Sequence, residues 1–288
     1  MMNDLIPQLR ESSIARQLGV TTLDNLVGNI TWTKSKGGIT AQHINTEEEE
    51  TGTESVATFD KIELTPHPIA AFVPLTFGMQ TQPAIALDAW VKSEIATQMA
   101  LLEDQSIFVG TGAASAPRGI FNHPNVSTSN WASVDTSLEI FQTALDVVKA
   151  TRKKFGQNLG NLGWATSPDV LYWLAKAKDT TNRAMFFSLT DGNLQTITAP
   201  PRMLRYPIMD TDQLDTGTDS AEQMMFGPWA DVYLGHWGTL VFAMSDQTET
   251  NFRKLRTTVR GVWQYDVGVF HADAFVKCTG IPTNVAPT

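Results

Sequence analysis

The chain has 288 residues and a formal charge of −9, from 21 Lys and Arg residues against 30 Asp and Glu residues. This balance lacks the basic footprint of a sequence-reading nucleic-acid-binding domain, and the single cysteine, Cys278, excludes a disulfide framework and a cysteine-based zinc cluster. No apolar run approaches the roughly 20 residues of a membrane-spanning helix, so no membrane partner is expected.

The proportion of charged residues is low for a chain that is also rich in large aromatic side chains. Charged residues make up 18% of the sequence, below the roughly 25% of ordinary globular domains, while 8 Trp and 14 Phe are spread along its length. This composition fits a large core, and it equally fits a surface that is buried against other copies of the chain.

The N-terminal quarter predicts a short helix followed by two strands. Apolar residues between positions 3 and 17 follow helical spacing, and Gly19 is expected to end that helix. Alternating polar and apolar residues predict strands over 29–33 and 55–64. The connection between the strands is charged, and its charged residues include Lys34, Lys36, Glu47, Glu48, Glu49, Glu50 and Glu54. Because an isolated two-stranded ribbon is marginally stable, its support is expected from elsewhere, such as another subunit.

The longest predicted helix follows. Pro66 and Pro68 are expected to break the next stretch, and a run without Gly or Pro then covers residues 84–108. Apolar residues recur in it three or four positions apart, which is typical of one buried helix face; they are Leu87, Val91, Ile95, Met99 and Leu102. The turn that begins at Gly110 is expected to end this helix.

Beyond Pro117, helices and short strands alternate. Helices are predicted over 138–155 and from Pro168 to about 178, the second with Ser167 as its N-cap. Strands are predicted over 163–166, 224–226, 229–234 and 239–244, and strand character returns within 262–278. A basic stretch precedes that last run, and its cations are Arg253, Lys254, Arg256 and Arg260.

No motif in the chain predicts enzyme chemistry. The glycine-rich segment 110–115 lacks the Gly-Lys-Ser/Thr ending of a phosphate loop. An aspartate-rich loop lacks the glycine and closing glutamate of a calcium site; its members are Asp210, Asp212, Asp215 and Asp219. His271 and Asp273 could share a face of a strand as a base and its orienting group, but a structural histidine is the favoured interpretation. We therefore expect no catalytic residue, no cofactor and no metal site.

The order of these features resembles that of a known family. The return strand reads VATFDKIELTPHPIAAFVPLT, the long helix ends in LLEDQSIFVGTG, a later segment reads WATSPDVLYWL, and the last long run reads NFRKLRTTVRGVWQYDVGVFHADAFVKCT. Together they resemble the major capsid proteins of tailed double-stranded DNA bacteriophages, whose fold is shared with herpesvirus shell floors and encapsulin compartments.

The resemblance implies an α+β phage capsid fold. Its expected parts are an N-terminal arm at 1–27, an extended β-hairpin loop at 28–65, a peripheral domain with a long spine helix at 66–117 and 246–279, an axial domain at 118–245, and a tail at 280–288.

Some members of that family cross-link their shells through an isopeptide bond. The bond joins a lysine near the loop tip to an asparagine of the peripheral domain, with a glutamate as base. Here no lysine lies between residues 41 and 60, and Leu255 and Val262 stand where the asparagine and glutamate align. We therefore expect a shell without covalent cross-links.

The function implied is self-assembly into hexamers and pentamers that build an icosahedral shell around double-stranded DNA, which is contained rather than read. Portal, scaffold or decoration proteins are the further partners implied, and the virion is the location implied, after assembly in the host cytoplasm. A scaffolding segment removed from the N-terminus and a separate scaffold protein both fit the sequence.

The acidic loop of one copy is expected to meet basic groups of a neighbour. The expected interface residues are Trp32, Lys34, Lys36, Glu47, Glu48, Glu49, Glu50, Glu54, Arg253, Lys254 and Arg256. Two other functions fit the residues less well. One is an encapsulin-type nanocompartment shell, and the other is a soluble hydrolase that uses His271 and Asp273.

Overall fold

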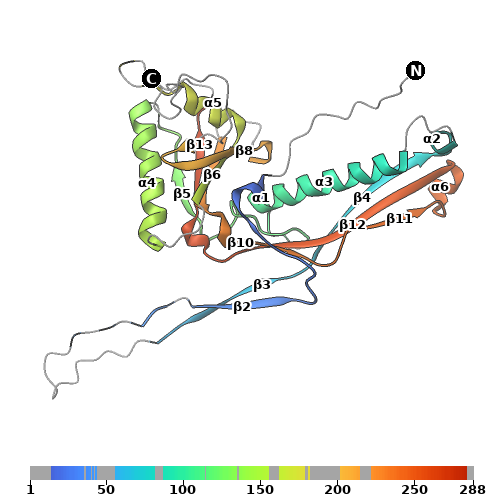
Figure 1. The fold of residues 1–288 in the computed structure, drawn as a ribbon, viewed down its shortest axis with the longest axis horizontal. Coiled ribbons are helices and arrows are strands. Elements are labelled where there is room, and N and C mark those ends of the chain that lie inside the picture. The colour runs from blue at the N-terminus through green and yellow to red at the C-terminus, as the bar shows by residue number, and fades with distance from the viewer. Residues whose placement is uncertain are drawn as a thin grey trace.

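The computed structural model describes residues 14–35, 37–39, 41, 43, 56–81, 87–113, 115–134, 136–155, 162–178, 181, 202–214 and 222–283. These residues form two main sheets with helices packed on them, and a two-stranded hairpin that projects from the body (Figure 1). Of the expected N-terminal helix the described part is α1 (Ala15–Leu18), and it ends as predicted at Gly19, whose φ is 98°.

The first sheet is built around one long strand. Strand β12 (Arg256–Val269) pairs along one side with β4 (His67–Thr76), and along the other with β10 (Val232–His236) and then β11 (Val241–Ser245), all antiparallel. Strand β1 (Thr21–Leu23) extends the sheet beside β10 in parallel. The N-terminal segment is thereby attached to the same sheet as the C-terminal strands.

Strand β4 corrects one prediction. We expected Pro66 and Pro68 to interrupt regular secondary structure, but residues 67–76 form a ten-residue strand that includes Pro68 and Pro74. Among the described strands β4 pairs with β12 alone, so it is an edge strand. Proline is tolerated there because its missing N–H removes no ladder hydrogen bond when that position faces away from the partner strand.

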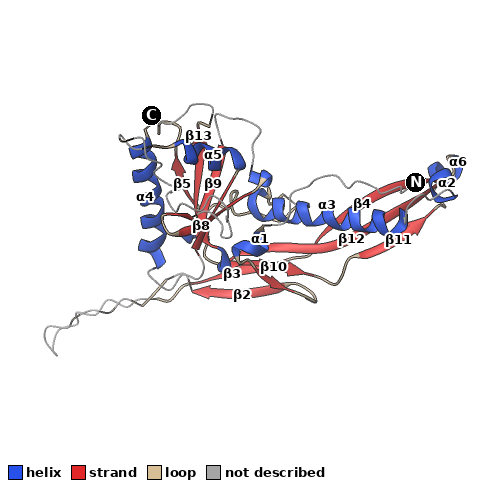
Figure 2. Cartoon of the chain, turned by 45° about the horizontal axis from the view of Figure 1, so that its top comes forward, coloured by secondary structure: helices blue, strands red, loops and turns tan. Residues whose placement is uncertain are grey.

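Helix α3 (Leu87–Val109) lies along one face of this sheet (Figure 2), and it is the expected long helix. Val91, Ile95 and Met99 are buried in a cluster with residues of β4 and β12. The close approach depends on Gly261, where an added Cβ would lie 2.5 Å from Ile95 Cγ2. The short helices α2 (Phe77–Thr81) and α6 (Glu249–Arg253) stand at the far end of the sheet (Figure 1).

The second sheet has six strands in the order β5-β13-β9-β6-β8-β7. Their bounds are β5 (Ser127–Asn130), β6 (Leu162–Thr166), β7 (Arg202–Met203), β8 (Tyr206–Asp210), β9 (Glu222–Pro228) and β13 (Val276–Ile281). One face is buried with α4 (Ser137–Phe155) and α5 (Pro168–Lys176) around Trp164, Trp173 and Phe226. The predicted cap of α5 is confirmed, because the Ser167 side chain accepts a hydrogen bond from the backbone N–H of Val170.

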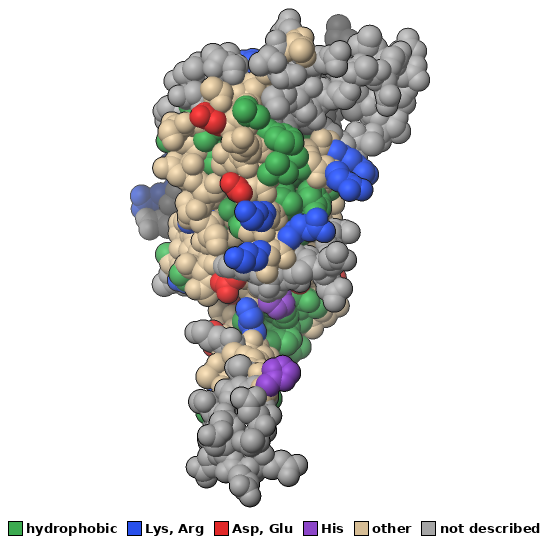
Figure 3. All heavy atoms as spheres, turned by 90° about the vertical axis from the view of Figure 1, so that its left-hand side faces the viewer, with side chains coloured by type: hydrophobic (Ala, Val, Ile, Leu, Met, Phe, Trp, Pro, Cys, Tyr) green, Lys and Arg blue, Asp and Glu red, His purple; other side chains and the backbone are tan. Residues whose placement is uncertain are grey.

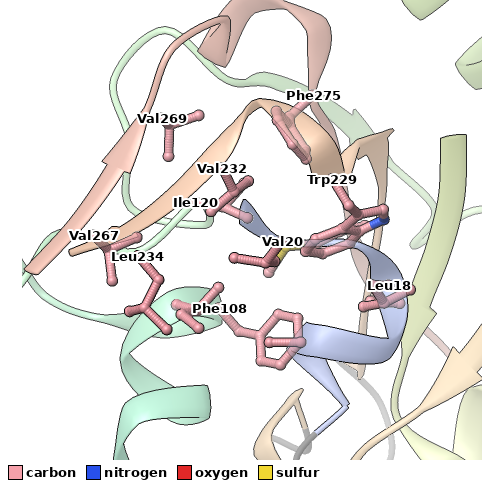
Figure 4. Packing of buried hydrophobic residues seen from close by; sticks show 14 of the residues in the cluster. Leu18, Val20, Phe108, Ile120, Trp229, Val232, Leu234, Val267, Val269 and Phe275 are labelled. Carbon is pink, nitrogen blue, oxygen red and sulfur yellow. The ribbon is translucent and has the colours of Figure 1, made fainter. Parts of the chain in front are cut away.

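A third cluster joins the two sheets (Figure 4). At its centre lies Trp229, in the 3-10 turn η2 (Trp229–Asp231) that connects β9 to β10. Its fully buried ring meets Phe108 and Phe275 edge-on, each at 5.7 Å between ring centroids. Its Nε1–H donates a hydrogen bond to the carbonyl oxygen of Gly163 at 3.0 Å. The other 3-10 turns are η1 (Asp212–Leu214) and η3 (Ala272–Ala274).

Sheet membership cuts across the expected domain boundaries. Strands β10 and β11, which precede residue 246, belong to the first sheet with β12, whereas β13 belongs to the second sheet between β5 and β9. Along the described strands the chain therefore passes between the two sheets three times, first between β4 and β5, then at η2 and again at η3. The division at residues 118 and 246 stays a prediction.

The hairpin consists of β2 (Ile30–Ser35) and β3 (Phe59–Leu64), paired antiparallel from Ile30–Leu64 to Ser35–Phe59. Both strands were expected from their alternating pattern. They run away from α2 and α6, so the hairpin and the far end of the first sheet point in opposite directions along the molecule (Figure 1).

Candidate assembly surface

The root of the hairpin is anchored by two of the expected interface residues. The Trp32 ring meets the Phe270 ring edge-on, at 5.2 Å between centroids, and lies 6.2 Å from the Tyr233 ring. Lys34 Nζ donates a hydrogen bond to the backbone carbonyl oxygen of Phe270 at 2.6 Å. Trp32 and Lys34 therefore hold the hairpin to their own chain, and a contact of either residue with a neighbour stays a prediction.

The segment that leads into the hairpin is fixed to the end of β10. The backbone N–H of Leu26 donates to the carbonyl oxygen of His236 at 3.0 Å, and Trp237 Nε1–H donates to the carbonyl oxygen of Gly28 at 2.7 Å. On the return side, the Asp266 carboxylate accepts the backbone N–H of Thr65 at 2.8 Å. Both ends of the hairpin are thus tied to the first sheet.

Beneath this root lies an ionic cluster in which His236 and Glu103 are buried while Asp24 and Arg16 are exposed. His236 Nδ1 lies 2.8 Å from Asp24 Oδ1 in the N-terminal segment, and its Nε2 lies 3.3 Å from Glu103 Oε1 in α3. Arg16 of α1 reaches the same Glu103 oxygen at 3.6 Å. Because a neutral imidazole has only one N–H, the two carboxylates can both accept hydrogen bonds only when His236 is protonated.

The pKa of His236 is raised above its usual value. Burial alone would lower the pKa, but the hydrogen bonds and negative charges of Glu103 and Asp24 outweigh burial. A histidine whose pKa is higher in the folded state adds stability below its unfolded pKa of about 6.5, and that stability is lost as the pH rises through the folded value. The attachment of the N-terminal segment is therefore strongest at mildly acid pH.

Replacing His236 with glutamine should destabilise the unassembled chain in a pH-dependent way. We expect a loss of roughly 1–3 kcal/mol at pH 6, since hydrogen bonds to charged groups are removed, and a smaller loss at pH 9. Urea unfolding at both pH values measures the difference. The matched control is His123→Gln, because burial is the largest cause that lowers the pKa of His123 and gives the opposite pH trend. An equal loss at both pH values for His236→Gln would contradict the protonated cluster.

Of the expected charged interface residues, the structure places Lys34 and the basic residues near α6. Lys36, the run from Glu47 to Glu50, and Glu54 lie outside the described residues. The end of the molecule opposite the hairpin carries three of the expected basic residues. They are Arg253 at the end of α6, the exposed Lys254 and the half-buried Arg256. A pairing of these basic residues with the acidic loop of another copy stays a prediction.

The negative net charge is unevenly distributed over the surface. On the side from which the hairpin projects, Lys and Arg side chains gather around the middle of the face (Figure 3). Helix α4 contributes exposed Lys149, Arg152 and Lys153, and Lys149 Nζ lies 3.8 Å from Asp146 Oδ1. An acidic chain thus presents a locally basic face.

The hydrolase alternative loses its geometric basis. His271 precedes the turn η3 and is not on a strand with Asp273, so the argument that the two residues share a strand face was wrong. His271 Nδ1 instead lies 2.9 Å from Asp231 Oδ2.

The aspartates of the expected polar loop are separated by structure. Asp210 ends β8 and Asp212 begins η1, while Asp215 and Asp219 lie outside the described residues. Across the described residues, no group of three or more His, Cys, Asp or Glu side chains could hold a metal ion. None of the helices within those residues is long and apolar enough to cross a membrane.

The positions aligned with the cross-linking residues are ordinary structural positions here. Leu255 is exposed in the turn between α6 and β12, at a φ of 49°, and Val262 pairs with Ala70 and Val241 inside the first sheet.

Comparison with known proteins gives this architecture a family. The family model described as "Phage capsid family" matches residues 1–280. A curated relative, the major capsid protein of Klebsiella oxytoca phage phiKO2, is 22% identical across 97% of this chain, and the chain spans 66% of the length of that relative.

Solved capsid structures share the fold. The capsid of a native GTA particle superposes with a TM-score of 0.76 at 13% identity, over 97% of this chain and 93% of that chain. A chain from Mycobacterium phage Ogopogo gives 0.69 at 15% identity, over 97% and 96%, and one from Gordonia phage Cozz gives 0.69 at 15%, over 96% and 88%. Since the family model covers nearly the whole sequence and the fold agrees throughout, this chain belongs to the phage capsid family.

Proposed function

We propose that this chain is the major capsid subunit of a tailed phage, which assembles into hexamers, pentamers and a closed icosahedral shell. The observation that carries the proposal is the separation of two unlike surfaces, the hairpin at one end and the basic turn after α6 at the other. Two unlike ends that complement each other allow head-to-tail binding of successive copies, and such a contact builds a ring when the rotation between copies closes.

The proposed mechanism of assembly is the repetition of contacts that are individually weak. The acidic run 47–50 and Glu54 of one copy meet Arg253, Lys254 and Arg256 of the next. A single exposed ion pair contributes roughly 0–1 kcal/mol, but many such contacts act together in a closed assembly. Electrostatic complementarity of this kind fixes the partner and the register more than it sets the affinity.

The shell encloses double-stranded DNA by containment, and its place is the virion, after assembly in the host cytoplasm. Portal, scaffold or decoration proteins complete the particle. An enzymatic role is not part of the proposal.

Size-exclusion chromatography with negative-stain microscopy tests the proposal. The purified chain should elute as capsomers or shells, far above its 31.6 kDa monomer, and shells should be visible. A protein that stays monomeric at all concentrations and salt conditions would reject the proposal. When the particles are boiled in SDS, they should run as one monomer band, because no lysine lies between residues 41 and 60 and Leu255 and Val262 provide no cross-linking chemistry.

A further inference from the structure

The segment that leads from β1 into the hairpin has no regular structure of its own. Residues 24–29, which we call the entry segment, belong to no helix or strand, and all of them are exposed except the half-buried Leu26. Its backbone is tied to the end of β10 by the hydrogen bonds of Leu26 with His236 and of Gly28 with Trp237. Exposed segments of this kind open at a low free-energy cost. Each additional tie therefore matters for how firmly the hairpin is held.

The additional tie of the entry segment is the contact of Asp24 with His236, and the two carboxylates that flank this histidine have unlike surroundings. The side chain of Asp24 is 67% exposed, whereas that of Glu103 is 4% exposed. Arg16 lies 3.6 Å from Glu103 Oε1, and Glu103 Oε2 is buried without a hydrogen-bond partner among the described residues. Water can therefore solvate Asp24 when it leaves His236, while Glu103 depends on the histidine for a strong hydrogen bond.

This difference decides which contact is lost when His236 gives up its proton. The protonated ring donates from both nitrogens, whereas the neutral ring keeps a single N–H. A buried carboxylate without a partner costs far more free energy than one that is returned to water. The remaining N–H therefore stays on Nε2 and points to Glu103. The lone pair of Nδ1 then faces the negative charge of Asp24, so proton loss breaks the contact with Asp24 selectively.

We propose that His236 is a positioning residue for the hairpin, which holds the entry segment through Asp24 while it is protonated and releases that segment when it loses its proton. After release the hairpin is still held at Phe270 by Trp32 and Lys34, so the hairpin gains freedom without detaching. The consequence for shells rests on the proposed function and deepens it, because the range of orientations that a subunit offers to its neighbour then depends on pH.

The other titratable groups beside His236 on β12 do not produce the same response. Tyr265 pairs with His236 in the sheet, and burial raises the pKa of its hydroxyl, so it stays uncharged. Burial also raises the pKa of Asp266, but its protonation weakens the bond to the Thr65 backbone as the pH falls, which is the opposite direction. His67 lies 3.4 Å from Asp266 and acts on the return side of the hairpin. Loosening of the entry segment with rising pH therefore reports on His236.

Hydrogen exchange of the unassembled chain, followed by mass spectrometry at pH 6 and pH 9 with labelling times scaled for the intrinsic rate, tests the proposal. Protection of residues 24–29 should fall by about tenfold or more at pH 9, the factor expected for loss of one hydrogen bond to a charged group, while α5 should keep its protection. In His236→Gln the protection should be equally weak at both pH values. Asp24→Asn should also remove the difference, because an amide can pair with either state of the ring.

The matched control is His67→Gln, which removes the histidine on the return side and should leave the pH difference in residues 24–29 unchanged. Because Asp24 is exposed, Asp24→Asn keeps the test available if His236→Gln does not fold. Equal protection at both pH values in the unmodified chain, or a difference that survives in Asp24→Asn, would overturn the role of His236 and leave the proposed function standing. A chain that shows the pH difference but never forms particles would overturn the proposed function alone.

Discussion

Replacing Trp229 with alanine should lower the free energy of unfolding of the unassembled chain by about 3–5 kcal/mol, the range for large aromatic truncations in cores. The ring is fully buried between Phe108 and Phe275. Its removal opens a cavity where the two sheets meet and leaves the Gly163 carbonyl without its indole donor. The two halves of the molecule share this cluster, so both should lose stability together.

Urea unfolding followed by far-UV circular dichroism measures this loss. The control is Tyr172→Ala, which removes an aromatic side chain that is 67% exposed on α5 and should change stability by less than about 0.5 kcal/mol. If Trp229→Ala were as mild as the control, the cluster would not be what joins the sheets.

Deleting residues 40–54 should leave a folded chain that cannot close shells. The deletion spares β2, β3 and all three buried clusters, so the melting temperature of the unassembled chain should stay close to that of the unmodified protein. It removes the glutamates that the proposed function places on a neighbour. Negative-stain microscopy should show no closed shells, and circular dichroism should show the native secondary structure.

A second variant separates the effect of the length of the loop from the effect of its charge. Changing Glu47, Glu48, Glu49 and Glu50 to glutamine keeps the length of the loop and removes its charge. If charge pairing selects the partner, this variant should assemble less completely than the unmodified chain, with its remaining assembly less sensitive to salt. Normal shells from the deletion itself would remove the loop from the assembly mechanism.

The helices and strands were predictable from the sequence where all the buried residues of an element pack against a single neighbouring element. In α3, Val91, Ile95 and Met99 face a single sheet, and their spacing of four reveals it. Leu102 was expected on the same face, yet it is 44% exposed, because the end of the helix turns a different side inward and packs Ile107 and Phe108 into the cluster around Trp229. A periodic pattern assumes one buried direction, and this helix has two.

The same limit appears in α4 and β4. In α4, Ile140 and Val148 are buried, whereas the apolar Leu145, three positions before Val148, is 42% exposed. Strand β4 contains two prolines, and they are tolerated only because the strand lies at the edge of its sheet. The local sequence pattern predicts whether a segment is a helix or a strand. The elements packed against that segment decide which departures from the pattern are tolerated.

The ionic cluster at the hairpin root could not be found from the sequence. His236 lies 212 positions from Asp24 and 133 positions from Glu103, so no spacing rule connects the three. A contact between copies through the candidate assembly residues stays a prediction from their charges. The sequence did not show that Trp32 and Lys34 anchor the hairpin to Phe270.

The fixed angle at which the hairpin leaves the body has a consequence for the geometry of the whole particle. A head-to-tail contact closes into a ring only if the rotation from one copy to the next divides a full turn evenly, and otherwise it grows into an open helix. In the proposed assembly, Trp32, Lys34 and Trp237 would contribute to that rotation, because their contacts hold the hairpin root to the body. The choice between five-fold rings, six-fold rings and tubes would then depend partly on contacts within a single chain.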